Sequence, residues 1–119
     1  LDPDDAELAD LMRGAAAFCL PSLAEGYGLP ALEALACGTP AIVSNRGALP
    51  EVVGDAALVV EPEVDAVTDA LRRVLGDADV AARLRAKGPA RARTLSWEGT
   101  ADGWMAAIER AVADATLAP

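Results

Sequence analysis

Residues 15–44, AAAFCLPSLAEGYGLPALEALACGTPAIVS, decide the fold. Two apolar runs, at 15–20 and 40–44, do not alternate with polar residues as a strand with one solvent-exposed face would. Such continuous runs are typical of parallel strands that are covered on both faces. Between them, residues 29–37 have the apolar spacing of a helix, with Pro30 near its start and Gly38 just after its end. Two parallel strands joined by a helix predict an α/β sheet with a right-handed crossover.

The segment before this stretch predicts a helix over residues 2–13. Asp2 is the expected cap and Gly14 the expected stop. Its apolar stripe consists of Leu8, Leu11 and Met12. After the stretch, alternating helices and strands continue. We expect them at residues 49–53 (helix), 57–60 (strand), 64–75 (helix), 79–93 (helix) and from Ser96 onward (helix).

The expected fold is therefore a Rossmann-like, three-layer α/β domain, with about three parallel strands and helices on both faces of the sheet. Three strands are few for such a sheet, and they leave an apolar edge unpaired. We interpret the chain as the second half of a larger sheet, and we expect self-association through the uncovered edge when the missing strands are absent.

Composition excludes several classes of function. The 119 residues carry a net charge of −9, which disfavours nucleic-acid binding. The chain has no His, so Ser-His or Cys-His triads and His-ligated metals are excluded, and no metal is expected. Cys19 and Cys37 have no CxxC spacing and are interpreted as core thiols in a reducing compartment, with a disulfide left open. Neither a membrane-spanning run nor a signal peptide is visible.

The loop at residues 22–28 carries the candidate chemistry. It follows the first predicted strand, and ligands of open α/β sheets bind at the carboxyl ends of strands. Gly26 and Gly28 allow a ligand close to the backbone, and the free N–H groups of the following helix favour a phosphate. Glu25 and Glu33 can accept sugar hydroxyls. Together these groups fit a nucleotide sugar; a loop that binds nothing and an acid/base pair for glycoside hydrolysis are the alternatives.

The phrase EGYGLPALEALACGTPAIVS contains two glutamates separated by seven residues, Glu25 and Glu33. It continues into NRGALPEVVG at residues 45–54 and ends with Ser96-Trp97-Glu98. In these motifs nearly the whole chain resembles the C-terminal, donor-binding domain of retaining GT-B glycosyltransferases of group 1 (GT4). Tyr27 stands where that family usually has Phe.

The resemblance implies a role for each matching residue. Glu25 would be the catalytic residue that contacts the transferred sugar, and Glu33 would bind the ribose of the nucleotide. The backbone amides facing the donor sugar and diphosphate would be those of Gly26, Tyr27, Gly28 and Leu29. Retention is usually explained in this family by front-face attack, in which a donor phosphate helps to take the acceptor proton. No cofactor beyond the donor substrate is implied.

The same resemblance implies that residues 1–119 are one part of a longer enzyme. The acceptor-binding N-terminal domain, and the first half of this domain with its diphosphate-binding Arg and Lys, would lie outside the chain, so this part alone is expected to be inactive. The acceptor would be a glycan, a lipid or a small molecule, and the location the cytoplasm, including the inner membrane face. The alternatives are a non-catalytic α/β module that binds nucleotides or supports a partner, and sugar-nucleotide epimerisation.

Four further features have two interpretations each. Glu51 is expected to cap a local turn rather than face the donor, and Arg46 to be an exposed loop residue rather than a phosphate contact. Trp97 and Trp104 lie seven residues apart and are expected to be packing anchors, although part of that helix face can be exposed. A basic cluster is interpreted as a solvated helix face, with membrane contact as the alternative. It consists of Arg83, Arg85, Lys87, Arg91 and Arg93.

Overall fold

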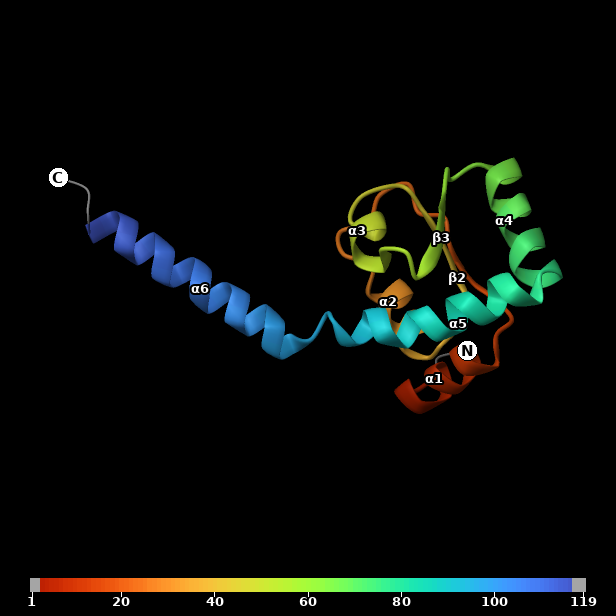
Figure 1. Cartoon of the computed structure of the whole chain (residues 1–119), viewed down its shortest axis with the longest axis horizontal. Coiled ribbons are helices and arrows are strands. Elements are labelled where there is room, and N and C mark those ends of the chain that lie inside the picture. The colour runs from red at the N-terminus through yellow and green to blue at the C-terminus, as the bar shows by residue number, and fades with distance from the viewer. Residues whose placement is uncertain (1–2, 117–119) are drawn as a thin grey trace.

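The computed structural model describes residues 3–116, and the side chains of residues 3–115. Helices and strands follow the expected order (Figure 1). Their bounds are α1 (Asp5–Gly14), β1 (Phe18–Leu20), α2 (Leu29–Ala36), β2 (Ala41–Ser44), α3 (Leu49–Val53), β3 (Ala57–Val60), α4 (Val64–Gly76), α5 (Ala78–Arg93) and α6 (Trp97–Thr116).

The three strands form one parallel sheet in the order β1-β2-β3. Ala41 of the central strand β2 is the partner of Phe18 in β1 and of Ala57 in β3. All four β2 residues are buried, because β2 has a strand on either side and helices above and below. Ala41 and Val43 point into one half of the core and Ile42 into the other, as the pleat of a strand requires.

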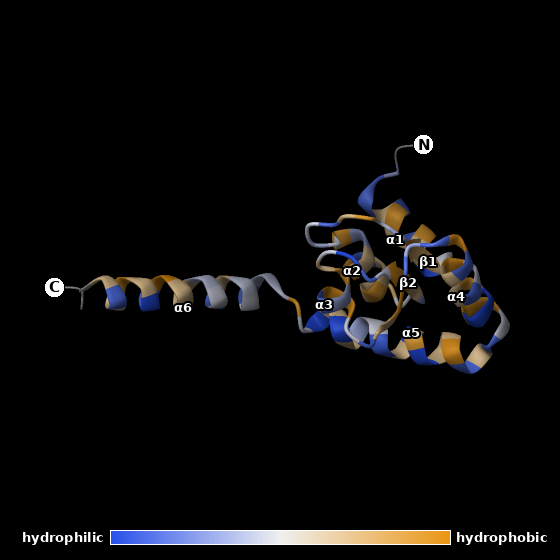
Figure 2. Ribbon diagram, turned by 90° about the horizontal axis from the view of Figure 1, so that it is seen from above, coloured by the Kyte–Doolittle hydropathy of each residue, from blue (hydrophilic) through white to orange (hydrophobic). Residues whose placement is uncertain are grey.

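Each face of the sheet has its own hydrophobic core. Helices α2 and α3 cover the first face, where Leu35, Leu49 and Val53 are fully buried. Helix α4 and the first half of α5 cover the second, with Val74 and Leu84 buried against Ile42. In Figure 2, apolar and polar residues alternate along α4 and α5, as in helices that bury one face. The predicted three-layer, Rossmann-like arrangement is confirmed.

Helix α5 continues past the sheet and packs closely on α2. Gly88 of α5 is buried at this contact. A Cβ atom at Gly88 would lie 2.8 Å from the carbonyl oxygen of Leu35 and 3.3 Å from its Cα. The two helix backbones therefore approach to a distance that only glycine permits at this position.

The first strand is shorter than predicted. It spans Phe18–Leu20 rather than residues 15–20, and its residues are half-buried rather than covered on both faces. The reason is its place at the edge of this sheet, where it pairs with β2 alone. Apolar composition at 15–17 could not reveal that the partner strand β2 begins only opposite Phe18, at Ala41.

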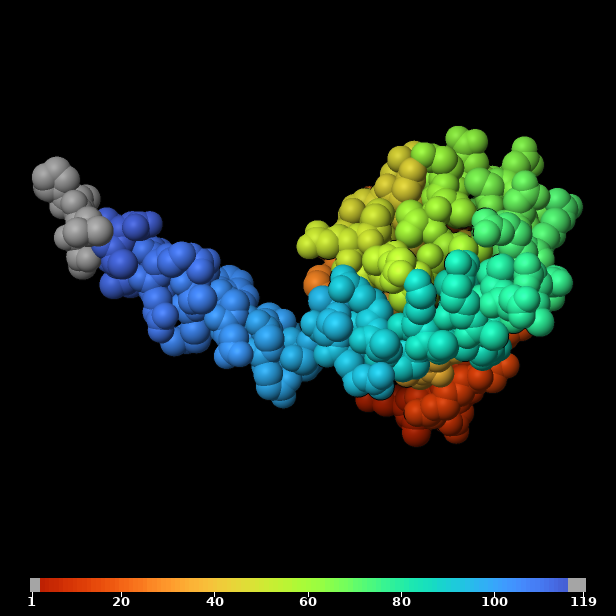
Figure 3. Space-filling view, viewed as in Figure 1, coloured from red at the N-terminus to blue at the C-terminus, as the bar shows by residue number. Residues whose placement is uncertain are grey.

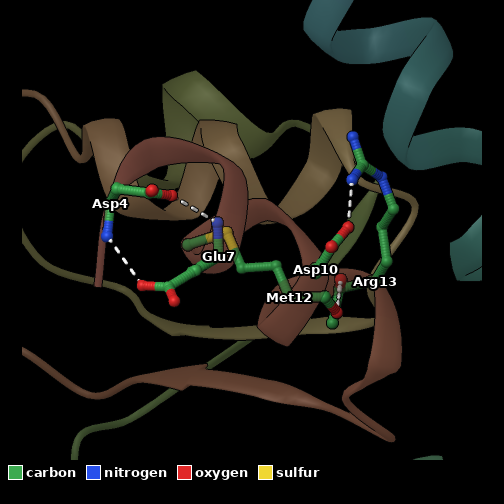
Figure 4. A network of polar contacts seen from close by, with 6 residues as sticks. Asp4, Glu7, Asp10, Met12 and Arg13 are labelled. Atoms are coloured by element: carbon green, nitrogen blue, oxygen red, sulfur yellow. Dashed lines mark hydrogen bonds and ion pairs between the residues drawn. The ribbon is translucent and has the colours of Figure 1, made fainter. Parts of the chain in front are cut away.

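Helix α1 begins at Asp5 and is capped by Asp4, whereas the predicted cap Asp2 lies outside the described residues. Asp4 accepts from the Glu7 amide at 2.9 Å, and the Glu7 carboxylate accepts from the Asp4 amide at 3.1 Å, which is a capping box (Figure 4). Met12 is buried, while Leu11 is 64% exposed despite its place in the predicted stripe. The second surface that Leu11 would need is not present among residues 3–116.

Helix α6 extends away from the rest of the chain, as Figures 1 and 3 show. The Ser96 hydroxyl caps it by accepting from the Gly99 amide at 3.0 Å. Trp97 and Trp104 are 81% and 68% exposed, so the prediction that they are packing anchors is wrong for this chain. No helix within residues 3–116 has the length and apolar content needed to cross a membrane.

Candidate functional site

The loop at residues 22–28 begins at the carboxyl end of β1, where the sequence predicted the ligand site. Ser44, the last residue of β2, donates a hydrogen bond from its buried hydroxyl to the carbonyl of Ser22 at 2.6 Å. At the other end of the loop, Gly28 is the N-cap of α2 and has φ +93°, in the left-handed region that favours glycine. The start and the end of the loop are thus both fixed by the scaffold.

A second loop, residues 45–48, holds the middle of the first one in place. The Ala48 amide donates to the carbonyl of Glu25 at 3.4 Å. Gly47 has φ +57°, and a Cβ atom there would lie only 2.3 Å from the same oxygen. Leu49 packs against Gly28 so closely that a Cβ at Gly28 would be 2.6 Å from Leu49 Cδ2. The backbone that carries Glu25 therefore rests on the N-terminal end of α3.

The backbone amides of the first loop are free. Within the described part of the chain, the N–H groups of Gly26, Tyr27, Gly28 and Leu29 donate no hydrogen bond. The next residue, Pro30, has no N–H group. These amides lie at the positive end of the α2 dipole, where an anion such as a diphosphate gains both hydrogen bonds and charge stabilisation. The loop therefore has free N–H groups at the positions where the sequence predicted them.

The two glutamates are placed differently. Glu25 is half-buried in the loop, and Glu33 is exposed one turn into α2. Neither carboxylate makes a hydrogen bond or an ion pair with another described residue, so both remain available to a ligand. Glu33 lines a cavity of about 310 Å³ between α1 and α2, together with Leu8 and Met12.

A second, more apolar cavity of about 250 Å³ lies beside the loop. Tyr27, Leu29 and Leu32 line it from the loop and α2, and Leu95 and Trp97 line it from the α5–α6 junction. Glu25 lines neither cavity, and no residue lines both. The structure thus places Tyr27 and Glu33, two predicted donor-binding residues, in different cavities. The free amides belong to the loop between β1 and α2.

The ends of β2 and β3 are joined by polar side chains. Asn45 and Arg46 both donate to the carboxylate of Glu61, with Arg46 at 2.7 Å. Arg46 is therefore an exposed, paired residue, in line with the favoured interpretation. The Oδ1 atom of Asn45 is buried without a partner in the described chain. The side chain of Glu51 makes no hydrogen bond with the described residues, so the predicted turn cap is not formed.

Three members of the basic cluster on α5 bind other elements, so the cluster is not the freely solvated helix face that the sequence favoured. Arg85 donates to the carbonyls of Gly38 and Ala15, and Lys87 pairs with Asp55. The guanidinium group of Arg91 donates to the carbonyls of Glu51 and Val52 at 2.6 and 2.9 Å. Periodicity on one helix cannot reveal such contacts, since the acceptors are backbone atoms of distant segments.

The cysteines are free thiols, and both are half-buried. Burial raises the pKa of the Cys19 thiol, which disfavours its reactive thiolate form. The hydrogen bond from Lys87 lowers the pKa of Asp55, and the charge of Lys87 adds to this effect. No group of three or more acidic or cysteine side chains within residues 3–116 is placed to hold a metal ion.

A parallel sheet covered on both faces, with a loop of free amides at the end of one strand, places the chain in the Rossmann-like class of α/β proteins. Within this class, the chain belongs to the glycosyl transferases group 1 family, whose model matches residues 2–91. The resemblance seen in the Glu25–Glu33 motif is thereby confirmed at the level of the family.

Individual relatives agree with this assignment. The chain is 45% identical over 114 residues to MMP alpha-(1->4)-mannosyltransferase of Mycolicibacterium hassiacum, covering 92% of this chain and 28% of that protein. It is 45% identical over 95 residues to O-antigen chain mannosyltransferase B of Escherichia coli, covering 79% and 25%. The structure of sucrose-phosphate synthase from Thermosynechococcus elongatus superposes with a TM-score of 0.75 at 35% identity, covering 91% and 28%. The chain thus spans about a quarter of the length of these relatives.

Sequence reasoning missed the residues that support the loop. Gly47, Ala48 and Leu49 belong to the NRGALPEVVG phrase, which was used for the resemblance but not assigned to the site. A glycine followed by a short Pro-containing helix is compatible with many local structures. Their contacts with Glu25 and Gly28 depend on how the ends of β1 and β2 lie side by side, which sequence spacing does not show.

Proposed function

We propose that the chain is the donor-binding part of a glycosyltransferase that moves a hexosyl group from a nucleoside-diphosphate sugar to a hydroxyl of a glycan, a lipid or a small acceptor. The observation that carries this proposal is the loop at residues 26–29. It presents unpaired amides at the start of α2 between two glutamates with no protein partner. Membership of the group 1 family and the mannosyltransferase relatives support the reaction class.

Each group has a chemical role in this proposal. The amides of Gly26, Tyr27, Gly28 and Leu29 bind the diphosphate and the donor sugar, since they combine hydrogen-bond donors with the helix dipole. Glu25 accepts hydroxyls of the transferred sugar, and Glu33 accepts ribose hydroxyls. Carboxylates suit these roles because each oxygen accepts two hydrogen bonds and charge-assisted bonds are strong.

The transfer itself needs little covalent chemistry from these residues. We propose a retaining reaction by front-face attack, in which the acceptor oxygen forms a bond to the anomeric carbon as the bond to the diphosphate breaks. The departing phosphate takes the acceptor proton. The loop contributes by positioning the donor and by stabilising the negative charge that develops on the leaving group. The missing positive charges and the acceptor site would be supplied by the rest of a longer protein, acting in the cytoplasm.

The test is a two-dimensional amide NMR titration of the full-length protein with UDP, GDP and ADP and with their glucose and mannose derivatives. We expect one nucleotide series to shift the Gly26 and Gly28 amides. Glu33→Ala should weaken binding of the nucleoside diphosphate itself, whereas Glu25→Ala should weaken binding of the sugar derivative more. Glu63→Ala is the matched control, because Glu63 is an exposed glutamate at the start of α4 whose side chain caps nothing.

Two results would contradict the proposal. Shifts that lie elsewhere, or that Glu33→Ala and Glu63→Ala affect equally, would reject the assigned site. A folded protein that binds none of these nucleotides would instead favour a module that only supports a partner.

A further inference from the structure

We propose that Arg91 is a positioning residue for the donor loop, acting from α5 through the short helix α3. This inference rests on the proposed function and adds a residue outside the Glu25–Glu33 motif. Arg91 touches neither glutamate; its contacts are with α3 and with Thr94. The role follows from what α3 does at each of its two ends.

Two carbonyls at the carboxyl end of α3 depend on Arg91 for their hydrogen bonds. A helix leaves its last four carbonyls without partners in the helix. In α3, the carbonyls of Pro50 and Val53 accept from the amides of Gly54 and Ala56. The two between them, of Glu51 and Val52, accept from the Arg91 guanidinium at 2.6 and 2.9 Å, and no other described donor reaches them.

The charge of Arg91 strengthens this contact. No carboxylate pairs with Arg91 within the described residues; besides the two α3 carbonyls, its guanidinium donates to the hydroxyl of Thr94 at 3.3 Å. Hydrogen bonds from a charged donor are roughly twice as strong as neutral ones.

The amino end of α3 supports the donor loop. Leu49, its first residue, is fully buried and packs on Gly28. The two residues before it, Gly47 and Ala48, contact the carbonyl of Glu25. Because α3 has only five residues, its two ends are about 7.5 Å apart, and a shift at Glu51 and Val52 is passed to the loop as a rigid-body movement.

The experiment compares two arginines of α5 in the full-length protein. Arg91→Ala removes the contact with α3. Arg85→Ala is the matched control, because Arg85 also donates to two backbone carbonyls, those of Gly38 and Ala15 at the opposite end of the strands. The protein carries 15N-labelled glycine, and the Gly26 amide is assigned with Gly26→Ala, a position with open space around it.

We expect Arg91→Ala to move the Gly26 signal before any ligand is added, and Arg85→Ala to leave it in place. Affinity for the nucleotide sugar that binds the wild-type protein should fall on the order of tenfold or more in Arg91→Ala, since small displacements of positioned groups have large effects. Arg85→Ala should stay within about twofold of wild type. Arg91→Lys, which keeps the charge but not the fork of donors, should lie between the two and serves if the alanine variant unfolds.

The outcomes separate the two claims. A Gly26 signal and an affinity that are the same in Arg91→Ala and Arg85→Ala would overturn the role of Arg91 and leave the donor site intact. A wild-type protein that binds no nucleotide sugar would overturn the proposed function, and with it any role of Arg91 in donor binding.

Discussion

Replacing Gly47 by Ala tests how the donor loop is held. Gly47 adopts φ +57°, and an added Cβ would lie 2.3 Å from the carbonyl oxygen of Glu25, 3.1 Å from its nitrogen and 3.2 Å from its carbonyl carbon. All three atoms belong to backbone, so no side chain can rotate away. The Glu25 carbonyl is also held by the Ala48 amide. The substitution therefore forces one of the two loops to move.

Two terms give the size of the effect. A left-handed conformation costs a non-glycine residue about 1–2 kcal/mol. Forcing an additional methyl group into a packed site costs about 1–3 kcal/mol more. We expect Gly47→Ala to lower the free energy of unfolding by roughly 2–5 kcal/mol, a large part of the stability of an ordinary domain. Affinity for the donor should fall as well, because the displaced group is the backbone of Glu25.

Urea unfolding followed by circular dichroism measures the first effect. The matched control is Gly26→Ala in the donor loop itself, where a Cβ meets nothing within 4 Å. Its free energy of unfolding should stay within about 0.5 kcal/mol of wild type. If Gly47→Ala were as stable as Gly26→Ala, the close approach of the two loops, and the argument built on it, would be refuted.

Three further experiments test the scaffold. Gly88→Ala gains about 1 kcal/mol of helix propensity but overpacks the contact with α2 by about 1–3 kcal/mol, so urea unfolding should show a net loss near 1 kcal/mol. Leu84→Ala should cost about 2–5 kcal/mol, whereas Trp104→Ala, although it removes a larger group, should change the unfolding midpoint very little. Carboxyl NMR should show the pKa of Asp55 below its ordinary value, and Lys87→Ala should restore it.

Two of these predictions have outcomes that would contradict them directly. Ala86→Gly, on the exposed face of α5, measures the loss of helix propensity alone. If Gly88→Ala stabilised the protein by as much as Ala86→Gly destabilises it, α2 would have moved aside to accept the added methyl group without cost. Because the folded-state pKa of Asp55 is lowered, its contribution to stability is present above the unfolded pKa and is lost as the pH falls through the folded one. An Asp55 pKa that Lys87→Ala leaves unchanged would show that the ion pair is not formed in solution.

The strands and most helices could be predicted because their signals are local. An apolar run such as 40–44 has the same meaning wherever it lies in the chain, and the element order of α2, β2, α3 and β3 follows from such runs with Pro and Gly between them. The candidate loop could be found for the same reason, since its glycines and glutamates are neighbours in sequence.

What escaped prediction depends on distant partners. Apolar spacing made Trp97 and Trp104 look like core residues, but burial needs a second surface, and the described chain leaves both side chains mostly exposed. Charge made Arg91 and Lys87 look solvated, although their partners lie on α3 and on the turn before β3. The spacing of apolar and charged residues in the sequence describes one face of one helix. The contacts of Arg91 and Lys87 depend instead on how several helices and strands pack together.

The interlocked loops have an energetic consequence for any ligand. Ordering a backbone residue costs about 1–2 kcal/mol of conformational entropy. At Glu25 and Gly28 this ordering takes place when the protein folds, because Gly47, Ala48 and Leu49 already hold both residues. A ligand that binds at these amides therefore does not have to order the loop, and little of its favourable binding enthalpy is offset by lost loop entropy. In calorimetry, such a ligand should show only a small entropic penalty.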